Sequence, residues 1–173
     1  MENVMNLHAM LNHFRAASKV IDIDWQKAAN SVGLTQAELH TLWIVYFDGR
    51  ASITTIANHG LWDRSTVMQV VKRLKDKGLV TVEKDNNDLR VSYVILTEEG
   101  KIRQMSTANA EFGSLYFIQQ LREKDREGFN KFMSFIIEFN KTYHGEDFVE
   151  WVDKTANDFE EDFDSILAKK IEN

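Results

Sequence analysis

The chain has 173 residues and a formal net charge of −6. With 43% hydrophobic and 28% charged residues, it can bury a core as one domain or as a domain with a helical extension. It contains no cysteine, which excludes disulfides, cysteine nucleophiles and thiolate metal sites and fits an intracellular protein. We find no signal peptide and no apolar run long enough to span a membrane, so we expect a cytoplasmic protein without membrane contact.

The first predicted element is a long helix over residues 5–31, which Gly33 ends. Its apolar positions follow alternating three- and four-residue steps, with Ser18 in the one missing place: Val4, Leu7, Leu11, Phe14, Ile21, Trp25, Ala28 and Val32. A seam of this kind packs against another helix. That second helix belongs either to the same subunit or to a second subunit, and the pattern leaves both open.

Two shorter helices are predicted next. Thr35 can cap the first of them, with Glu38 three residues later completing a capping box. The residues that follow are apolar on nearly all sides, so this helix should be buried until Asp48 and Gly49 break it. Ser52 then caps a short helix that carries Ile53, Ile56 and Ala57.

The next segment predicts a basic helix from Asp63 to Lys77. Its apolar face comprises Val67, Val70, Val71 and Leu74. At 100° per residue, the opposite face carries Ser65, Gln69 and Lys72, flanked by Trp62, Thr66, Met68 and Arg73. An apolar anchor behind hydrogen-bonding side chains is the division that a recognition helix needs in the major groove. The alternative is an ordinary amphipathic helix with a solvated charged face.

A two-stranded hairpin is predicted after Gly78, with strands over 79–83 and 91–96. The loop between them holds Asn86, Asn87 and Asp88, which can supply a turn. We expect Arg90 to enter a narrow minor groove, where negative potential is concentrated, with Asp88 holding its guanidinium by a salt bridge. The alternative for this pair is a surface contact of little energetic value.

The order of helix, turn, basic helix and hairpin predicts a winged helix-turn-helix that binds double-stranded DNA. Residues 63–78 hold five basic and two acidic residues, a net charge of +3, whereas residues 140–173 hold four basic and ten acidic residues, a net charge of −6. DNA would be steered to the basic face. We expect Gln69 to pair with an adenine edge and Lys72 and Arg73 to meet phosphates. The predicted DNA-binding residues are Trp62, Arg64, Ser65, Thr66, Gln69, Lys72, Arg73, Lys84, Asn86, Asn87 and Arg90, with Asp88 as the support of the wing.

Beyond the hairpin, Thr97 should cap another helix, and apolar stripes from residue 129 to 139 and from 148 to 167 predict further helices on either side of Gly145. We therefore expect a mainly α fold with a small β-hairpin wing. The expected organisation is an N-terminal dimerisation helix in residues 1–34, a winged helix-turn-helix DNA-binding domain in residues 35–100, and C-terminal dimerisation helices with an acidic tail in residues 101–173.

Several of these motifs resemble the MarR family of bacterial transcriptional regulators. The wing carries Gly78-Leu79-Val80, Asp88-x-Arg90 and Leu96-Thr97-x-x-Gly100. The resemblance implies an obligate homodimer with a winged helix-turn-helix in each subunit and an interface built by helices from both chain ends. Many members of the family release DNA when a small aromatic acid binds between the dimerisation and DNA-binding regions, so the resemblance raises the same question for this chain.

A narrower resemblance, over roughly residues 20 to 170, is to the Hpr (ScoC) branch of that family. It rests on Asp24-Trp25-Gln26, Leu42-Trp43-Ile44, Ala51-Ser52-Ile53, Ser65-Thr66, Tyr143-x-Gly145-Glu146-Asp147-Phe148 and Asn157-Asp158-Phe159-Glu160. This branch implies a repressor of genes for extracellular proteases and sporulation in Bacillus-type bacteria. Asn86-Asn87 departs from the more basic wings of many family members.

Other readings of the chemistry are weaker. An effector pocket could be lined by Trp25, His40, Trp43 and Tyr46, although packing in the core explains the same residues, so an effector is possible but not indicated. A zinc site built from Asp22, Asp24, His40 and His144 lacks tight ligand spacing. We interpret His59 as structural or close to a phosphate. No cofactor or metal is expected.

An enzyme is the alternative from another class. Clustered carboxylates at Glu160, Glu161, Asp162 and Asp164 could suggest acid–base chemistry, but at helical spacing they spread over a solvated face. No glycine-rich phosphate loop or nucleophile elbow is present, so we predict no enzymatic activity. A winged helix that has lost DNA binding and contacts another protein also remains open, since a fold does not fix function.

Overall fold

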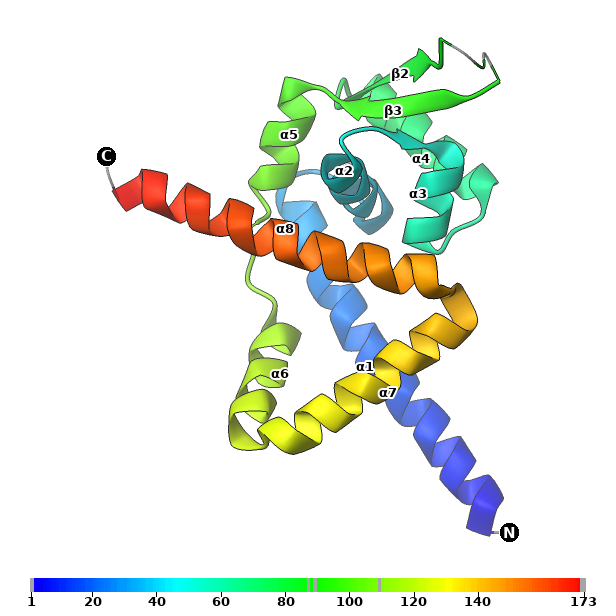
Figure 1. Ribbon diagram of the computed structural model, residues 1–173, viewed down its shortest axis with the longest axis vertical. Coiled ribbons are helices and arrows are strands. Elements are labelled where there is room, and N and C mark those ends of the chain that lie inside the picture. Colours follow the sequence, from blue (N-terminus) through cyan, green and yellow to red (C-terminus); the bar gives the residue numbers. More distant parts are fainter. Residues whose placement is uncertain (1, 87, 89, 109, 172–173) are drawn as a thin grey trace.

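The computed structural model describes residues 2–86, 88, 90–108 and 110–171, and it does not describe the side chains of residues 1–5 and 159–173. Helices dominate, with a small sheet among them, so the predicted fold class is confirmed (Figure 1). The elements in chain order are α1 (Glu2–Ser31), α2 (Gln36–Asp48), β1 (Ala51–Ser52), α3 (Ile53–Gly60), α4 (Arg64–Asp76), β2 (Val80–Lys84), β3 (Ser92–Leu96), α5 (Glu98–Met105), α6 (Gly113–Lys124), α7 (Arg126–His144) and α8 (Glu146–Ile171).

The predicted helix caps are present. Thr35 and Glu38 form the capping box of α2, in which the Thr35 amide donates to Glu38 Oε2 at 2.9 Å. Ser52 accepts from the Thr55 amide at 3.0 Å and caps α3. The long first helix begins at Glu2, three residues before the predicted start, and nothing in the sequence there marks a boundary.

The predicted hairpin is present as β2 and β3, and the strand β1, which was not predicted, extends it to a three-stranded antiparallel sheet in the order β1-β3-β2. β1 pairs Ala51 with Val94 and Ser52 with Tyr93. A two-residue strand shows no alternation of side chains, and its pairing crosses about forty residues of chain, so local pattern could not reveal it. β2 begins and ends one residue later than predicted, whereas β3 begins one residue later and ends at the predicted residue.

The core is centred on α2, which contacts α1, α3, α4, α5 and the sheet (Figure 1). Its buried apolar residues Leu39, Leu42, Ile44 and Val45 are fully enclosed. The predicted apolar face of α4 is buried against them, through Val67, Val70, Val71 and Leu74. This burial sets which face of α4 is turned to the core and which faces away from it.

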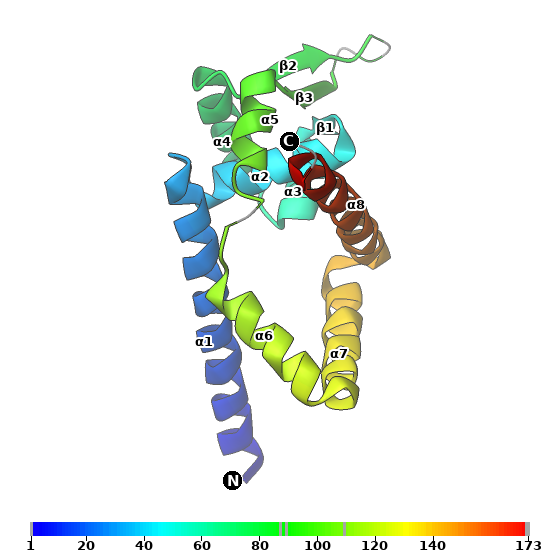
Figure 2. The same cartoon turned by 90° about the vertical axis from the view of Figure 1, so that its left-hand side faces the viewer.

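The helices α1, α6 and α7 extend away from this core, whereas α8 contacts α3 (Figure 2). α1 points away from the sheet, so its start and the wing lie at opposite ends of the molecule, and α6 lies beside α1 (Figure 2). The helix α6 was not predicted. Large apolar side chains are exposed on these helices: Leu7, Leu11 and Phe14 on α1, Leu115, Tyr116 and Phe117 on α6, and Phe132, Phe135 and Phe139 on α7. Within the described residues, no helix is both long and apolar enough to cross a membrane.

Candidate nucleic-acid interface

The start of α4 is organised by Asp63, which is its N-cap and lies just outside the helix. The Thr66 amide donates to Asp63 Oδ1 at 2.9 Å, and the hydroxyls of Ser65 and Thr66 donate to the same carboxylate. These hydrogen bonds, with that of Ser65 the strongest, hold the pKa of Asp63 well below its usual range. Two predicted DNA-contacting hydroxyls are thus already oriented at the helix start.

The face of α4 opposite the core is exposed, as the helical spacing requires. Ser65, Gln69 and Lys72 lie on this face with Met68, whose side chain is 62% exposed. Trp62 is different, because its ring is partly buried and packs edge-on against His40 at a centroid distance of 5.3 Å. The exposed side chains present the hydrogen-bonding surface that base reading needs.

A depression of about 360 Å³ separates the start of α4 from the base of the wing. Two arginines line it, Arg64 from the start of α4 and Arg90 from the wing. Arg64 Nη2 donates to Thr54 Oγ1 at 2.7 Å, so the arginine is directed across the start of α3. The other lining residues are Ser52, Ile53, Thr54, Met68, Val91 and Ser92. Two cations with hydroxyl donors suit a DNA phosphate.

Sequence reasoning did not find the hydroxyls of Ser52, Thr54 and Ser92 as members of this depression. The one available signal was the Ser-x-Thr start of α3, since helix N-termini favour anions. Ser92 could not be found, because its place depends on how β3 docks beside α3.

The wing contains the predicted pair of Asp88 and Arg90. Arg90 Nε lies 2.9 Å from Asp88 Oδ1, and Arg90 Nη2 lies 2.9 Å from Asp88 Oδ2, which makes the contact bidentate. The guanidinium lowers the pKa of Asp88, and the carboxylate raises the pKa of Arg90. The Arg90 side chain is 90% exposed. Lys84 and Asn86 are also exposed, and Asn87 lies outside the described residues.

Arg73 is placed differently from Lys72. Its Nε lies 3.4 Å from Oε1 of Glu38 in α2, so the guanidinium has an intramolecular partner on the flank of α4. Lys72, one residue earlier, lies on the exposed face. The expected contact of Arg73 with a phosphate stays a prediction, and it would compete with this ion pair.

Comparison with known proteins agrees with this geometry. The profile of the MarR family matches residues 34–92. The chain is 31% identical over 163 residues to the HTH-type transcriptional regulator Hpr of Shouchella clausii, covering 93% of this chain and 83% of that protein. It is 33% identical over 162 residues to the DNA-binding transcriptional repressor ScoC of Bacillus subtilis, covering 90% and 77%. The chain belongs to the MarR family. It is an Hpr-like transcriptional regulator and not an enzyme.

Solved structures give the same fold. A cysteine-to-serine mutant of MarR from E. coli, complexed with operator DNA, matches with a TM-score of 0.64 and 15% identity, covering 77% of this chain and 94% of that one. Reduced AbfR bound to DNA matches with a TM-score of 0.59 and 19% identity, covering 72% and 95%. Both proteins are MarR-type winged helices in their DNA-bound state, so the likeness supports the fold of this MarR-family chain.

The residues considered for an effector pocket in this MarR-family chain are brought together in part. Trp25, His40 and Trp43 line a cavity of about 490 Å³, which α8 covers through Trp151. Tyr46 is not among the lining residues. Burial lowers the pKa of His40, so its imidazole is neutral near pH 7. The same aromatic residues therefore pack against one another and line the cavity.

The other candidate ligands have structural roles. Asp24 accepts from the Ser114 amide at 2.8 Å, which lowers its pKa, and Asp22 accepts from Gln36. His59 stacks on Trp151 at a centroid distance of 4.2 Å, in agreement with a structural role. Within the described part of the chain, no three histidine or acidic residues are grouped so that they could hold a metal ion.

Proposed function

We propose that this protein is a sequence-specific repressor that binds a pseudo-palindromic operator as a homodimer. The observation that carries the proposal is the pairing of an exposed polar face on α4 with the depression lined by Arg64 and Arg90. In this arrangement Gln69 reads a base edge in the major groove, and Lys72 with the two arginines holds the phosphate backbone. The wing then follows the backbone into the neighbouring minor groove.

Dimerisation is assigned to the exposed apolar helices in residues 1–34 and 101–173, with residues 35–100 binding DNA. Phe14 on α1, Phe117 on α6 and Phe135 on α7 are 43%, 59% and 54% exposed. Soluble monomers rarely expose apolar surface on this scale, so a second copy is the expected cover. A two-fold dimer presents two recognition helices to half-sites about one helical turn apart.

The likeness to Hpr and ScoC supports a regulatory target set of the same type. We therefore propose genes for extracellular proteases and sporulation as the targets. Genome-wide mapping of bound fragments tests this assignment, and fragments from unrelated gene classes would contradict it.

A second candidate adds control by a small aromatic ligand. The observation that favours it is the cavity of about 490 Å³, which lies between α1, α2 and α8 and therefore joins the proposed dimer region to the winged helix. Its lining is aromatic, with the neutral His40 imidazole as one polar group. A ligand there would bias the angle between these regions and change DNA affinity.

The test of the main proposal is binding to fragments selected from the organism's own genome, with matched variants. Gln69→Ala should lower affinity by about 1–3 kcal/mol on the selected site and relax the preference at one base pair. Lys72→Ala should weaken binding on all sequences and reduce the salt dependence. Lys131→Ala on α7 is the control, because α7 lies apart from α4 (Figure 1) and this exposed lysine pairs with Glu127 of its own helix.

Two results would overturn the proposal. One is that Gln69→Ala and Lys72→Ala bind every fragment as the wild type does. The other is that Lys131→Ala weakens binding as much as Lys72→Ala does. Either result would favour a winged helix that contacts another protein.

A further inference from the structure

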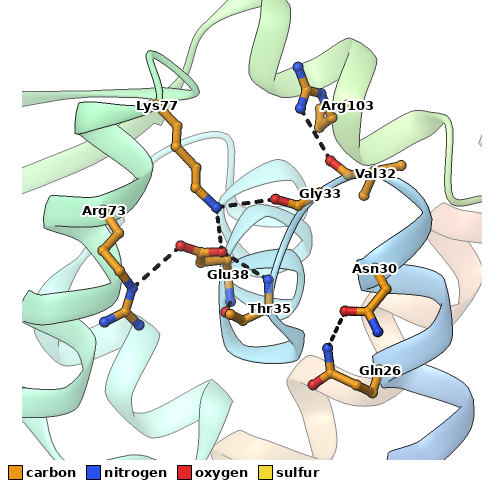
Figure 3. A network of polar contacts seen from close by, with 9 residues as sticks. All are labelled: Gln26, Asn30, Val32, Gly33, Thr35, Glu38, Arg73, Lys77 and Arg103. Atoms are coloured by element: carbon orange, nitrogen blue, oxygen red, sulfur yellow. Dashed lines mark hydrogen bonds and ion pairs between the residues drawn. The ribbon is translucent and has the colours of Figure 1, made fainter.

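A buried carboxylate joins the helix α1 to the recognition helix α4. Glu38 is only 1% exposed, and it lies in the first turn of α2, directly behind the C-terminal half of α4 (Figure 3). Its Oε2 accepts from Lys77 Nζ at 2.8 Å, and its Oε1 lies 3.4 Å from Arg73 Nε. Arg73 lies in the last turn of α4, and Lys77 is the C-cap of the same helix.

The same cluster reaches the end of α1. Lys77 Nζ also donates to the Gly33 carbonyl at 3.2 Å, and Arg103 Nη1 in α5 donates to the Val32 carbonyl at 3.2 Å (Figure 3). Carbonyls at the C-terminal end of a helix have no partner within the helix, and here side chains from α4 and α5 supply one. The turn between α1 and α2 is therefore held to the end of α4 by ionic and hydrogen bonds.

Capping α2 alone does not explain this arrangement. A capping box works with an exposed glutamate, whereas burying a carboxylate is unfavourable unless cations and donors surround it. Burial by itself would raise the pKa of Glu38, but the Lys77 hydrogen bond and the Thr35 amide outweigh it and the pKa is lowered. The carboxylate is therefore ionised at neutral pH and attracts both α4 cations.

We propose that Glu38 is a positioning residue for DNA recognition, which fixes the angle between the dimerisation helix α1 and the recognition helix α4. This inference rests on the proposed function. In the dimer, α1 carries the apolar seam and α4 carries the reading face, so the tie between them sets the separation of the two α4 helices. That separation determines which half-site spacing the dimer accepts. On this proposal, Arg73 acts through its ion pair with Glu38, in place of the phosphate contact that the sequence predicted.

The first test compares the wild type with Glu38→Gln, which keeps the size of the side chain and an acceptor for Thr35 but loses the charge. Binding is measured on duplexes whose half-sites are identical and whose spacer is shortened or lengthened by single base pairs. We expect Glu38→Gln to lower the affinity for the duplex with native spacing about tenfold. Its affinity for duplexes with altered spacing should fall less, so the preference for one spacing becomes weaker. Lys77→Met should broaden it in the same way.

Ile56→Val is the control, because it weakens the core in α3 without touching this cluster. It should lower affinity, if at all, equally on every spacing. The inference is overturned if Glu38→Gln shows the wild-type spacing profile or changes it no more than Ile56→Val does.

A second measurement does not depend on DNA. The chain has no cysteine, so Lys75→Cys places one nitroxide on the exposed side of α4 in each subunit. The distance between the two labels should be narrowly distributed in the otherwise wild-type dimer and clearly broader when Glu38→Gln is added. Equal widths would contradict the positioning role even if DNA binding is specific. Absence of any sequence preference by the wild type would instead contradict the proposed function.

Discussion

Trp151 in α8 donates a hydrogen bond from its indole Nε1 to Asp48 Oδ1 at 3.0 Å, although 103 residues separate the two along the chain. The same indole stacks on His59 in α3 with an interplanar angle of 18°. The last helix is thereby fastened to the end of α2 and to the first helix of the helix-turn-helix. A movement of α8 in the proposed dimer region would therefore displace the end of α2 and the helix α3, which lies beside the DNA-binding face.

Removing the indole donor should weaken this attachment. Trp151→Phe keeps an aromatic ring against His59 but removes the indole donor from Asp48 Oδ1, so we expect a loss of about 1 kcal/mol in the free energy of unfolding. Urea denaturation measures it. Val152→Ala, at a neighbouring half-exposed position, is the control. A Trp151→Phe protein as stable as the wild type would show that the hydrogen bond contributes nothing.

The ion pair of Asp88 and Arg90 in the wing should contribute to DNA affinity and not to the stability of the fold. Arg90 is exposed and Asp88 is partly exposed, and ion pairs at the surface contribute little to folding. We expect Arg90→Ala to leave the melting temperature unchanged, to weaken DNA binding, and to reduce the slope of log affinity against log salt by about 0.9, as loss of one phosphate-type contact requires. Asp88→Ala should weaken binding less. An unchanged salt slope in Arg90→Ala would remove this arginine from the interface.

The core contains a buried polar side chain, and replacing it with a hydrophobic residue should raise the stability of the protein. Gln104 in α5 is fully buried, and within the described part of the chain neither its amide nitrogen nor its amide oxygen has a hydrogen-bond partner. Gln104→Met fills a similar volume without the buried amide, so we expect about 1 kcal/mol of added stability and a melting temperature about 2–4 °C higher. Calorimetry checks this. A lower melting temperature would mean that the amide is satisfied in solution.

The buried carboxylate predicts a pH dependence. The pKa of Glu38 is lowered in the folded protein from its usual value of 4.5, so its contribution to stability is present above about pH 4.5 and is lost as the pH falls through the folded pKa. The stability gap between the wild type and Glu38→Gln should be constant near neutrality and close below about pH 4.5. Urea denaturation across this range gives the gap. A gap that does not change with pH would mean that Glu38 is not ionised in the fold.

Local hydrogen bonds explain which parts of the fold were predictable. The caps at Thr35, Ser52 and Thr97 each need only residues within three positions, and all three are present. The helix α6 was missed because its N-cap is Phe112, which makes no side-chain capping bond. Its apolar side chains Leu115, Tyr116 and Phe117 are consecutive, so they show no helical period.

The candidate site divides in the same way. The exposed face of α4 follows from helix geometry and the position of Val67 and Leu74, so it could be read from the sequence. The partner of Arg73 could not, because Glu38 reaches it only through the packing of α2 behind α4. Thr54 and Ser92 likewise join the depression through contacts between elements that are far apart in sequence.

The central claim is that the protein reads DNA sequence. Fluorescence anisotropy of the wild type on a selected genomic duplex, beside a scrambled duplex of equal length and composition, tests it most directly when titrated at several salt concentrations. The account predicts a preference for the selected duplex of at least about 10³-fold, together with affinity that falls steeply as salt rises. Weak and equal binding to both duplexes at every salt concentration would contradict it.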